Sequence, residues 1–326
     1  MKNTQKIIST SILLLVVFVF GYYVFKNISS LQQIFQIAFN WCNVLNIILI
    51  VFISIINFFL TGYLLDVLAT SFSIHLKLKE SFGLAMVTRF YNTITPFRGG
   101  MVARAIYLKK KHNFPYVHFL ATLGAIYILI FMVGCLTGMA SMVLIWSYNG
   151  LFNPLIFALF FITFIFLSGM MIFSPRLKDR DNKWVNRVIK IINGWNLIKN
   201  NKKVIVSTLV ITVIQLILGV IIIQISYSIF GISLPFYKSL FLASINSISI
   251  MVSITPGNLG VGDAISVFSA VLIGVAINES IASTVLVRAI TLVLTFILGP
   301  IFSYMLLRHN PLDIKRLETE KNETNT

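Results

Sequence analysis

The sequence predicts an all-α polytopic membrane protein, with about six spanning helices and two re-entrant, broken-helix hairpins in an inverted repeat. Three observations predict this class. The mean hydropathy is +0.90, and 11% of the residues are charged, against about 25% in soluble domains. Apolar runs recur along residues 1–326, which we treat as a single transmembrane domain. The tripeptide Ile-Thr-Pro occurs twice inside such runs, at residues 94–96 and 254–256.

Six apolar runs are long enough to cross about 30 Å of hydrocarbon as helices. They are residues 7–25, 44–69, 116–146, 154–173, 204–230 and 281–307. The first run follows Lys2 and Lys6 and in this respect resembles a signal peptide. It is longer than a signal sequence requires and lacks a small-x-small cleavage site, so we expect a retained membrane anchor.

Two further regions, residues 81–109 and 236–278, are apolar but interrupted by proline and glycine. In the first, arms of about fifteen and ten residues are too short to span, which predicts a re-entrant hairpin. In the second, arms of about twenty and sixteen residues fit either a re-entrant hairpin or two short spanning helices. A broken helix in hydrocarbon leaves backbone groups unpaired unless protein or a polar cavity receives them. The two breaks therefore predict a ligand site.

The placement of Lys and Arg predicts the sidedness of the chain. The net charge is +16. Lys and Arg are enriched in the cytoplasmic loops of membrane proteins, so this charge is explained without binding to nucleic acid, which we do not expect. With both termini in the cytoplasm, Lys26 and Lys238 are the basic residues left on the opposite face. Residues 44–146 (repeat 1) and 204–307 (repeat 2) then become upside-down copies, the pattern of transporters with alternating access to a central site.

The linker at residues 174–203 is basic, and its residues 183–200 have the periodicity of an amphipathic helix. The apolar face of this helix is expected to contain Trp184, Val188, Ile191, Ile192, Trp195 and Ile198. Such a helix lies on the cytoplasmic leaflet or packs on the helix bundle, and both alternatives stay open. The polar tail at residues 308–326 is expected in the cytoplasm.

Arg98 and Arg104 flank the first break, with Arg89 on the preceding arm. An arginine deep in a bilayer costs at least about 2.5 to 3.5 kcal/mol and faces a partner or a wet cavity. Guanidinium groups match phosphate bidentately, so Arg98 and Arg104 are candidates for an anion-binding site. The alternative is that both extend to the cytoplasmic surface and only orient the hairpin.

The second break contains Pro256, Gly257 and Gly260, and Asp263 follows them. The glycines permit positive φ and close approach of the backbone, whereas a nucleotide-binding glycine loop would need an α/β sheet around it. Asp263 stands where the returning helix begins, and a carboxylate is favoured there by the helix dipole.

Asp263 also has functional interpretations. It can pair with Arg288 on the last span or with Arg104 across the repeats, which would lower the insertion cost of both groups and form a gate. It can also serve as a proton-coupling carboxylate. Arg89 and Arg288 are therefore candidates for a gate or ion pair, and outward extension of the Arg288 side chain to the surface is the alternative.

Other chemistry has no support in the residues. Cys42 and Cys135 lie in or beside apolar segments and are interpreted as packing residues. The four histidines lack metal-ligand spacing, and no Ser/His/Asp order or paired carboxylates stand out. We therefore expect no catalytic residue, no metal and no cofactor.

Residues 95–100 with Arg104, followed by residues 255–263, resemble the transmembrane flippase domain of lysylphosphatidylglycerol synthases and its stand-alone relatives, over about residues 7–308. The first motif would contain Pro96, Arg98, Gly100 and Arg104, and the second Pro256, Gly257, Gly260 and Asp263. The family more often has glutamate at the last position. Met101 departs from the pattern, because an acidic residue is common there in relatives.

The resemblance implies a multi-pass protein of the bacterial cytoplasmic membrane that moves a lipid with a charged or glycosylated headgroup between leaflets. No segment resembles the soluble aminoacyl-transferase domain, so we do not expect an enzyme. The alternatives are an ion-coupled transporter of a small soluble anion and a non-catalytic partner of an envelope transferase, such as a phosphatidylglycerol lysyltransferase. The expected partners are membrane lipids, with a transferase as a further candidate. The lipid and the oligomeric state are not predicted.

Overall fold

The computed structural model describes residues 40–95, 98–173, 183–252 and 255–308, and the described part is helical without strands. This confirms the all-α polytopic class. Within these described residues, five helices are long and apolar enough to cross a membrane. They are α3 (Trp41–Ala69), α6 (Tyr116–Asn149), α7 (Pro154–Ile172), α9 (Lys202–Ser228) and α12 (Ile277–Arg308). Their bounds lie within a few residues of the predicted spans, and the sixth, at residues 7–25, lies outside the described residues.

The turn between α6 and α7 shows how local sequence sets these bounds. Gly150 adopts a left-handed φ of 67° and ends α6, and the Asn153 side chain accepts hydrogen bonds from the first backbone N–H groups of α7. A β-carbon on Gly138 would lie 2.7 Å from the Phe160 ring. The small residue therefore lets the two helices pack closely.

The first hairpin consists of α4 (Leu78–Ile94) and α5 (Gly99–His112). Thr95 is extended after α4, and Arg98 has a left-handed φ of 56° before α5. A β-carbon on Gly100 would lie 2.0 Å from the backbone oxygen of Thr88. Only glycine therefore lets the start of α5 approach α4 this closely.

The second hairpin runs from α10 (Phe236–Ser249) through the short 3-10 helices η3 (Ile250–Val252) and η4 (Pro256–Asn258) to α11 (Val261–Leu272). The helices α10 and α11 have 14 and 12 residues. At about 1.5 Å per residue neither crosses about 30 Å of hydrocarbon. Of the two alternatives for this region, the short arms fit the re-entrant hairpin.

The two breaks have matching backbone conformations at two equivalent positions that the structure describes. Thr95 and Thr255 are both extended, and Arg98 and Asn258 are both left-handed, with φ of 56° and 59°. Each pair is 160 positions apart, as Pro96 is from Pro256. The faint similarity between the two Ile-Thr-Pro segments is therefore matched by equivalent backbone geometry at these two pairs of residues.

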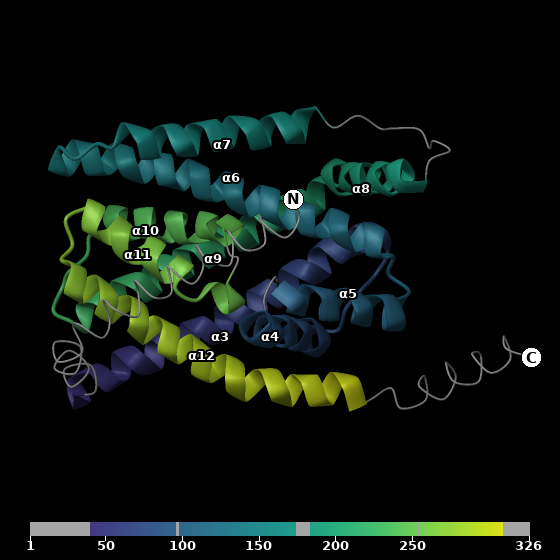
Figure 1. Ribbon diagram of the computed structural model, residues 1–326, viewed down its shortest axis with the longest axis horizontal. Coiled ribbons are helices and arrows are strands. Elements are labelled where there is room, and N and C mark those ends of the chain that lie inside the picture. Colours follow the sequence, from purple (N-terminus) through teal and green to yellow (C-terminus); the bar gives the residue numbers. More distant parts are fainter. Residues whose placement is uncertain (1–39, 96–97, 174–182, 253–254, 309–326) are drawn as a thin grey trace, which may run out of the picture.

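The contacts between helices follow the same equivalence. The helices α3, α4, α5 and α6 of repeat 1 correspond in this order to α9, α10, α11 and α12 of repeat 2. The contact of α4 with α12 has its counterpart in that of α10 with α6, and the contact of α3 with α6 in that of α9 with α12. The symmetry element passes between α3 and α9, which pack on each other. In Figure 1, α4 and α5 lie in one half of the molecule and α10 and α11 in the other. This arrangement is the one expected of an inverted repeat.

The helix α8 (Lys183–Asn200) forms over the predicted residues and packs on α6 and α9. Trp195 and Ile198 are buried in a cluster shared with α3, α6 and α9. A β-carbon on Gly194 would lie 2.8 Å from that of Ala121 on α6. These contacts support the alternative in which the apolar face of the linker helix packs on the bundle.

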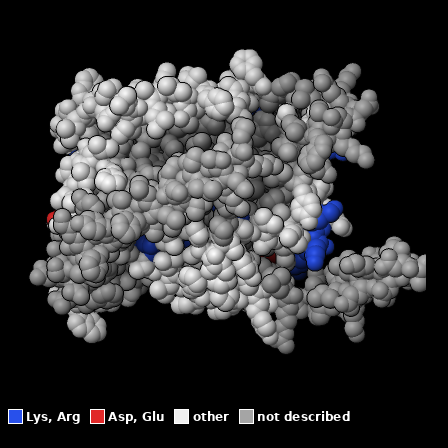
Figure 2. Space-filling view, viewed as in Figure 1, with Lys and Arg blue, Asp and Glu red and all other residues white. Residues whose placement is uncertain are grey.

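Basic side chains gather at the end of the molecule where α5 ends (Figure 2). Lys109, Lys110 and Lys111 are exposed there. Glu80, at the start of α4, accepts hydrogen bonds from Tyr107 and from Lys111, at 2.9 and 3.2 Å, and contacts His112 Nε2 at 2.7 Å. These contacts join the outer ends of the two arms of the first hairpin.

The pKa of Glu80 reflects this cluster. Burial raises it, but the hydrogen bonds from His112, Tyr107 and Lys111 outweigh burial and hold it below its usual 4.5. A lowered carboxylate pKa stabilises the fold above the unfolded pKa, and that contribution is lost as pH falls through the folded pKa.

We predict that Glu80→Gln lowers the unfolding midpoint in detergent by about 2 to 4 °C at neutral pH, because it removes about 1 kcal/mol of charge-assisted bonding. The difference from the wild type should shrink as pH falls below 4.5. A difference that stays constant down to the acid limit would contradict the assignment.

We also predict that Gly100→Ala destabilises the protein by at least about 1 to 3 kcal/mol, because the new methyl group meets backbone that cannot move aside cheaply. The matched control is Gly124→Ala in α6, where a β-carbon meets nothing within 4 Å and helix propensity should raise stability by about 0.5 to 1 kcal/mol. Thermal unfolding of both variants in detergent makes the comparison, and equal midpoints would refute it.

Candidate functional site

A cavity of about 330 Å³ lies beside the second break. Its walls come from α4, α9, α10, α11, α12 and η4. Its apolar side chains are those of Ile223, Leu242 and Val287, and the remaining lining residues are polar or charged, apart from Gly262. A polar cavity among membrane-spanning helices is the setting in which broken backbone is tolerated.

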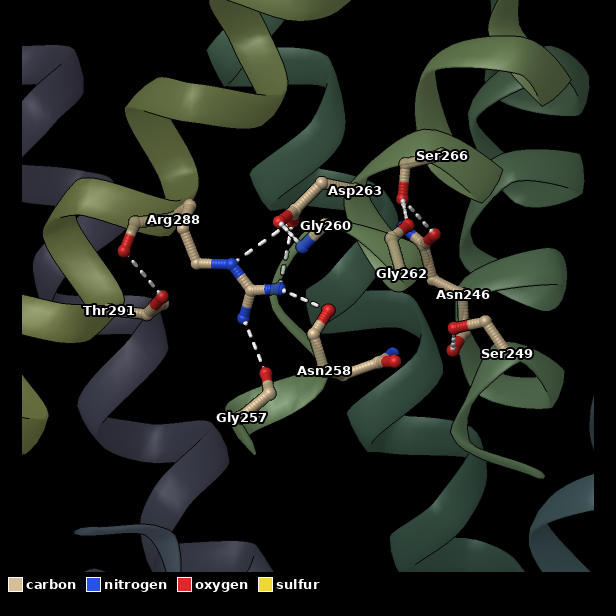
Figure 3. Close-up of polar contacts among 10 residues, drawn as sticks. All are labelled: Asn246, Ser249, Gly257, Asn258, Gly260, Gly262, Asp263, Ser266, Arg288 and Thr291. Carbon is tan, nitrogen blue, oxygen red and sulfur yellow. Dashed lines mark hydrogen bonds and ion pairs between the residues drawn. The ribbon is translucent and has the colours of Figure 1, made fainter. Parts of the chain in front are cut away.

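Arg288 on α12 holds the second break together (Figure 3). Its Nε and Nη2 lie 3.0 and 2.8 Å from Asp263 Oδ1. Its Nη1 donates to the carbonyl of Gly257 and its Nη2 to that of Asn258, each at 3.0 Å. We call this set of bonds the Arg288 clamp. One side chain thus pairs a carboxylate and two backbone oxygens that the interrupted helix leaves without helical partners.

Asp263 is both a cap and an ion-pair partner. Its Oδ2 accepts the backbone N–H of Gly260 at 3.0 Å, while its Oδ1 receives Arg288. The residue is 8% exposed. Capping and pairing were alternatives for this carboxylate in the sequence, and the structure combines them. Arg288, rather than Arg104, is the arginine that it contacts.

Serine and asparagine side chains join the cavity walls. Ser226 on α9 and Ser283 on α12 are 2.6 Å apart, and Ser266 on α11 donates to Asn246 on α10 at 2.6 Å. Sequence reasoning missed these four residues, because single small polar residues are common in apolar helices. The signal that could have identified them as cavity residues was their position within or beside the arms of the second hairpin.

Arg89 is the residue that repeat 1 contributes to the cavity lining. Its Nε donates to Thr295 on α12 at 3.2 Å, and its guanidinium carbon lies 4.4 Å from the centre of the Phe58 ring. Within the described part of the chain no carboxylate lies within 4.0 Å of Arg89. Of the two arginines proposed for a gate or ion pair, Arg288 thus has an acidic partner there and Arg89 does not.

Arg98 connects the two breaks. It donates through Nη1 to Tyr127 on α6 at 2.6 Å and through Nη2 to the carbonyl of Ile250, at the end of α10. The second break also approaches α4, because a β-carbon on Gly257 would lie 3.3 Å from Thr93. The tips of the two hairpins therefore meet inside the molecule.

Arg104 is 4% exposed and donates from Nε to Thr88 on α4 at 2.7 Å. It is packed between the arms of the first hairpin, and neither Arg98 nor Arg104 lines the cavity. The structure therefore does not place these two arginines together on one open anion site, and their role in binding stays a prediction. Pro96 lies outside the described residues. Pro256 begins η4, and Gly260 precedes α11 with a φ of 78°.

Metal chemistry gains no support, since the described residues contain no group of three or more His, Cys, Asp or Glu side chains suited to hold an ion.

The chain matches the family model described as the lysylphosphatidylglycerol synthase transmembrane region over residues 7–299, which include both breaks and every residue lining the cavity. No curated protein and no solved structure matches it.

We predict that Asp263 and Arg288 are energetically coupled. Asp263→Asn, Arg288→Gln and the double variant form a cycle whose coupling energy should be about 1 to 3 kcal/mol, because each single change leaves a largely buried charge without its partner. Arg288→Lys is the matched control that keeps the charge and loses the planar fork, and its stability should be intermediate. Additive effects in thermal unfolding would contradict the clamp.

Proposed function

The chain belongs to the family of the lysylphosphatidylglycerol synthase transmembrane region, and from this premise we propose that it is a lipid transporter of the flippase type. The protein moves the charged or glycosylated headgroup of a phospholipid or polyprenyl-linked lipid between the leaflets of the bacterial cytoplasmic membrane. The proposed orientation places both termini and the basic end of the molecule in the cytoplasm.

The observation that carries this proposal is the cavity at the second break, which polar and charged side chains line among apolar ones. A headgroup passing through hydrocarbon needs polar partners at mid-depth, since each unsatisfied polar group costs several kcal/mol there. A volume of about 330 Å³ lies at the lower end of the range for ligand sites, about 300 to 1,000 Å³, and suits a headgroup. The acyl or isoprenyl tails would stay in the surrounding bilayer.

The outer surface supports the same proposal. Leu155, Ile162 and Phe166 on α7 are 80%, 65% and 65% exposed, and α3 exposes Leu45 and Phe52. Such faces are stable against lipid chains and costly against water. Tails can therefore follow these faces while the headgroup passes inside the protein.

The inverted arrangement suggests how the site would open alternately. The second hairpin contacts repeat 1 at Arg98 and Thr93, and Arg89 of repeat 1 lines the cavity beside it, so a rocking movement of one repeat against the other would change the access to the cavity. Arg98 would couple the two breaks during this movement, because it is bound to α6 and to the end of α10.

The alternative of a transporter that couples a small soluble anion to protons has less support. Both oxygens of Asp263 are engaged, one by Arg288 and one by the Gly260 N–H. These bonds suit a structural carboxylate better than a proton carrier. We propose no catalytic activity for this domain. If the protein is instead a non-transporting partner of an envelope transferase, the isolated protein would move no lipid.

We predict that the reconstituted protein accelerates headgroup movement across vesicles and that Arg98→Ala abolishes it. The sharper variant is Arg98→Asn, because asparagine occupies the equivalent left-handed position, Asn258, of the second break. It removes the guanidinium without the backbone strain, so headgroup movement should fall at least about tenfold in a protein that still folds.

Fluorescent lipids read by a membrane-impermeant quencher make this measurement. Undiminished movement by Arg98→Asn would remove the role of Arg98, and the absence of movement by the folded wild type would reject the transport function itself.

A further inference from the structure

We infer that the cavity selects an anionic, hydroxyl-bearing headgroup of the phosphoglycerol class over a cationic aminoacylated or a zwitterionic one. This inference rests on the proposed function and specifies its substrate. It follows from three features of the lining: the balance of charge, the occupation of the carboxylate, and an acceptor atom without a partner.

The lining carries an excess of positive charge. Two of its side chains are cationic, Arg89 and Arg288, and one is anionic, Asp263. Charges interact strongly where water is scarce, so one uncompensated positive charge in a cavity favours an anion and opposes a cation. An aminoacyl headgroup would add positive charge to a site that already has an excess.

The single carboxylate of the lining is not available to an ammonium group. Asp263 Oδ1 receives Arg288 at 2.8 and 3.0 Å, and Oδ2 receives the Gly260 N–H at 3.0 Å. An ammonium that displaced Arg288 would also release the carbonyls of Gly257 and Asn258 from the clamp. Burying such groups without partners costs about 1 to 3 kcal/mol each, which opposes the exchange.

Arg89 is the cation best placed for a phosphate. Its Nε donates to Thr295 and its guanidinium carbon lies over the Phe58 ring, so the side chain is oriented by both neighbours. No carboxylate in the described residues lies within 4.0 Å of it. A guanidinium oriented in this way suits bidentate bonding to a phosphodiester, and its fixed orientation lowers the entropy lost on binding.

The hydroxyl groups of the headgroup would find partners on the same walls. Asn258 Oδ1 is buried and, within the described part of the chain, accepts no hydrogen bond, although Asn258 lines the cavity. A headgroup hydroxyl that reached this atom would satisfy the acceptor. Ser249 and Thr284 line the same space and offer further hydroxyl groups.

The test uses three lipids with identical labelled acyl chains: phosphatidylglycerol, lysyl-phosphatidylglycerol and phosphatidylethanolamine. In vesicles containing the wild type, phosphatidylglycerol should cross at least about tenfold faster than the other two. Arg89→Gln should remove most of this advantage, and Arg89→Lys, which keeps the charge, should retain part of it. Equal or faster movement of the lysyl lipid, or an Arg89→Gln protein with wild-type preference, would overturn the inference.

A binding measurement separates this inference from the proposed function. In detergent, phosphatidylglycerol should raise the unfolding midpoint more than the lysyl lipid does, and Arg89→Gln should lose the difference. This outcome supports the selectivity of the cavity even if no lipid moves in vesicles. The absence of lipid movement would reject the transport function and leave the binding selectivity intact. Equal stabilisation by both lipids overturns the selectivity. If inorganic phosphate stabilises the protein as much as phosphatidylglycerol does, the site binds a soluble anion. That result overturns the inference that the cavity binds a lipid headgroup.

Discussion

The structure depends on one constraint, that backbone polar groups inside a bilayer must be bonded within the protein. Two helices are nevertheless interrupted, and the second interruption persists because Arg288 reaches from α12 to two of its carbonyls and to Asp263. The clamp converts a costly break into a stable wall of a polar cavity. A cationic side chain at this depth is itself costly, and the carboxylate and the two carbonyls offset that cost.

The two repeats use equivalent breaks differently. In repeat 2 the arginine belongs to the last helix and binds the break, whereas in repeat 1 the arginine, Arg98, belongs to the break and binds Tyr127 on the last helix. Arg98 also reaches the carbonyl of Ile250 and so joins the two hairpin tips. The cavity lies on the repeat 2 side, with Arg89 as the contribution of repeat 1. The residues that line this cavity therefore come mainly from repeat 2.

Much of the fold was predictable because hydropathy and proline placement act locally. The five described spans, both breaks and the helix at residues 183–200 follow from such signals. The cavity did not follow, because its walls combine residues such as Arg89, Asn246 and Ser283 that only packing brings together. The same limit explains why Arg98 and Arg104 were expected on one anion site. Their spacing along the chain does not show that the arms of the hairpin enclose Arg104 against Thr88.

The most direct test asks whether the cavity reaches both faces of the membrane in turn. A cysteine is placed at Ser249, which lines the cavity and donates its hydroxyl to its own helix, in a protein whose Cys42 and Cys135 are replaced. Membrane-impermeant thiol reagents are then applied to one side or the other of oriented vesicles. Alternating access predicts labelling from each side, slowed in both cases by phosphatidylglycerol. Labelling from one side only, whatever lipid is present, would contradict it.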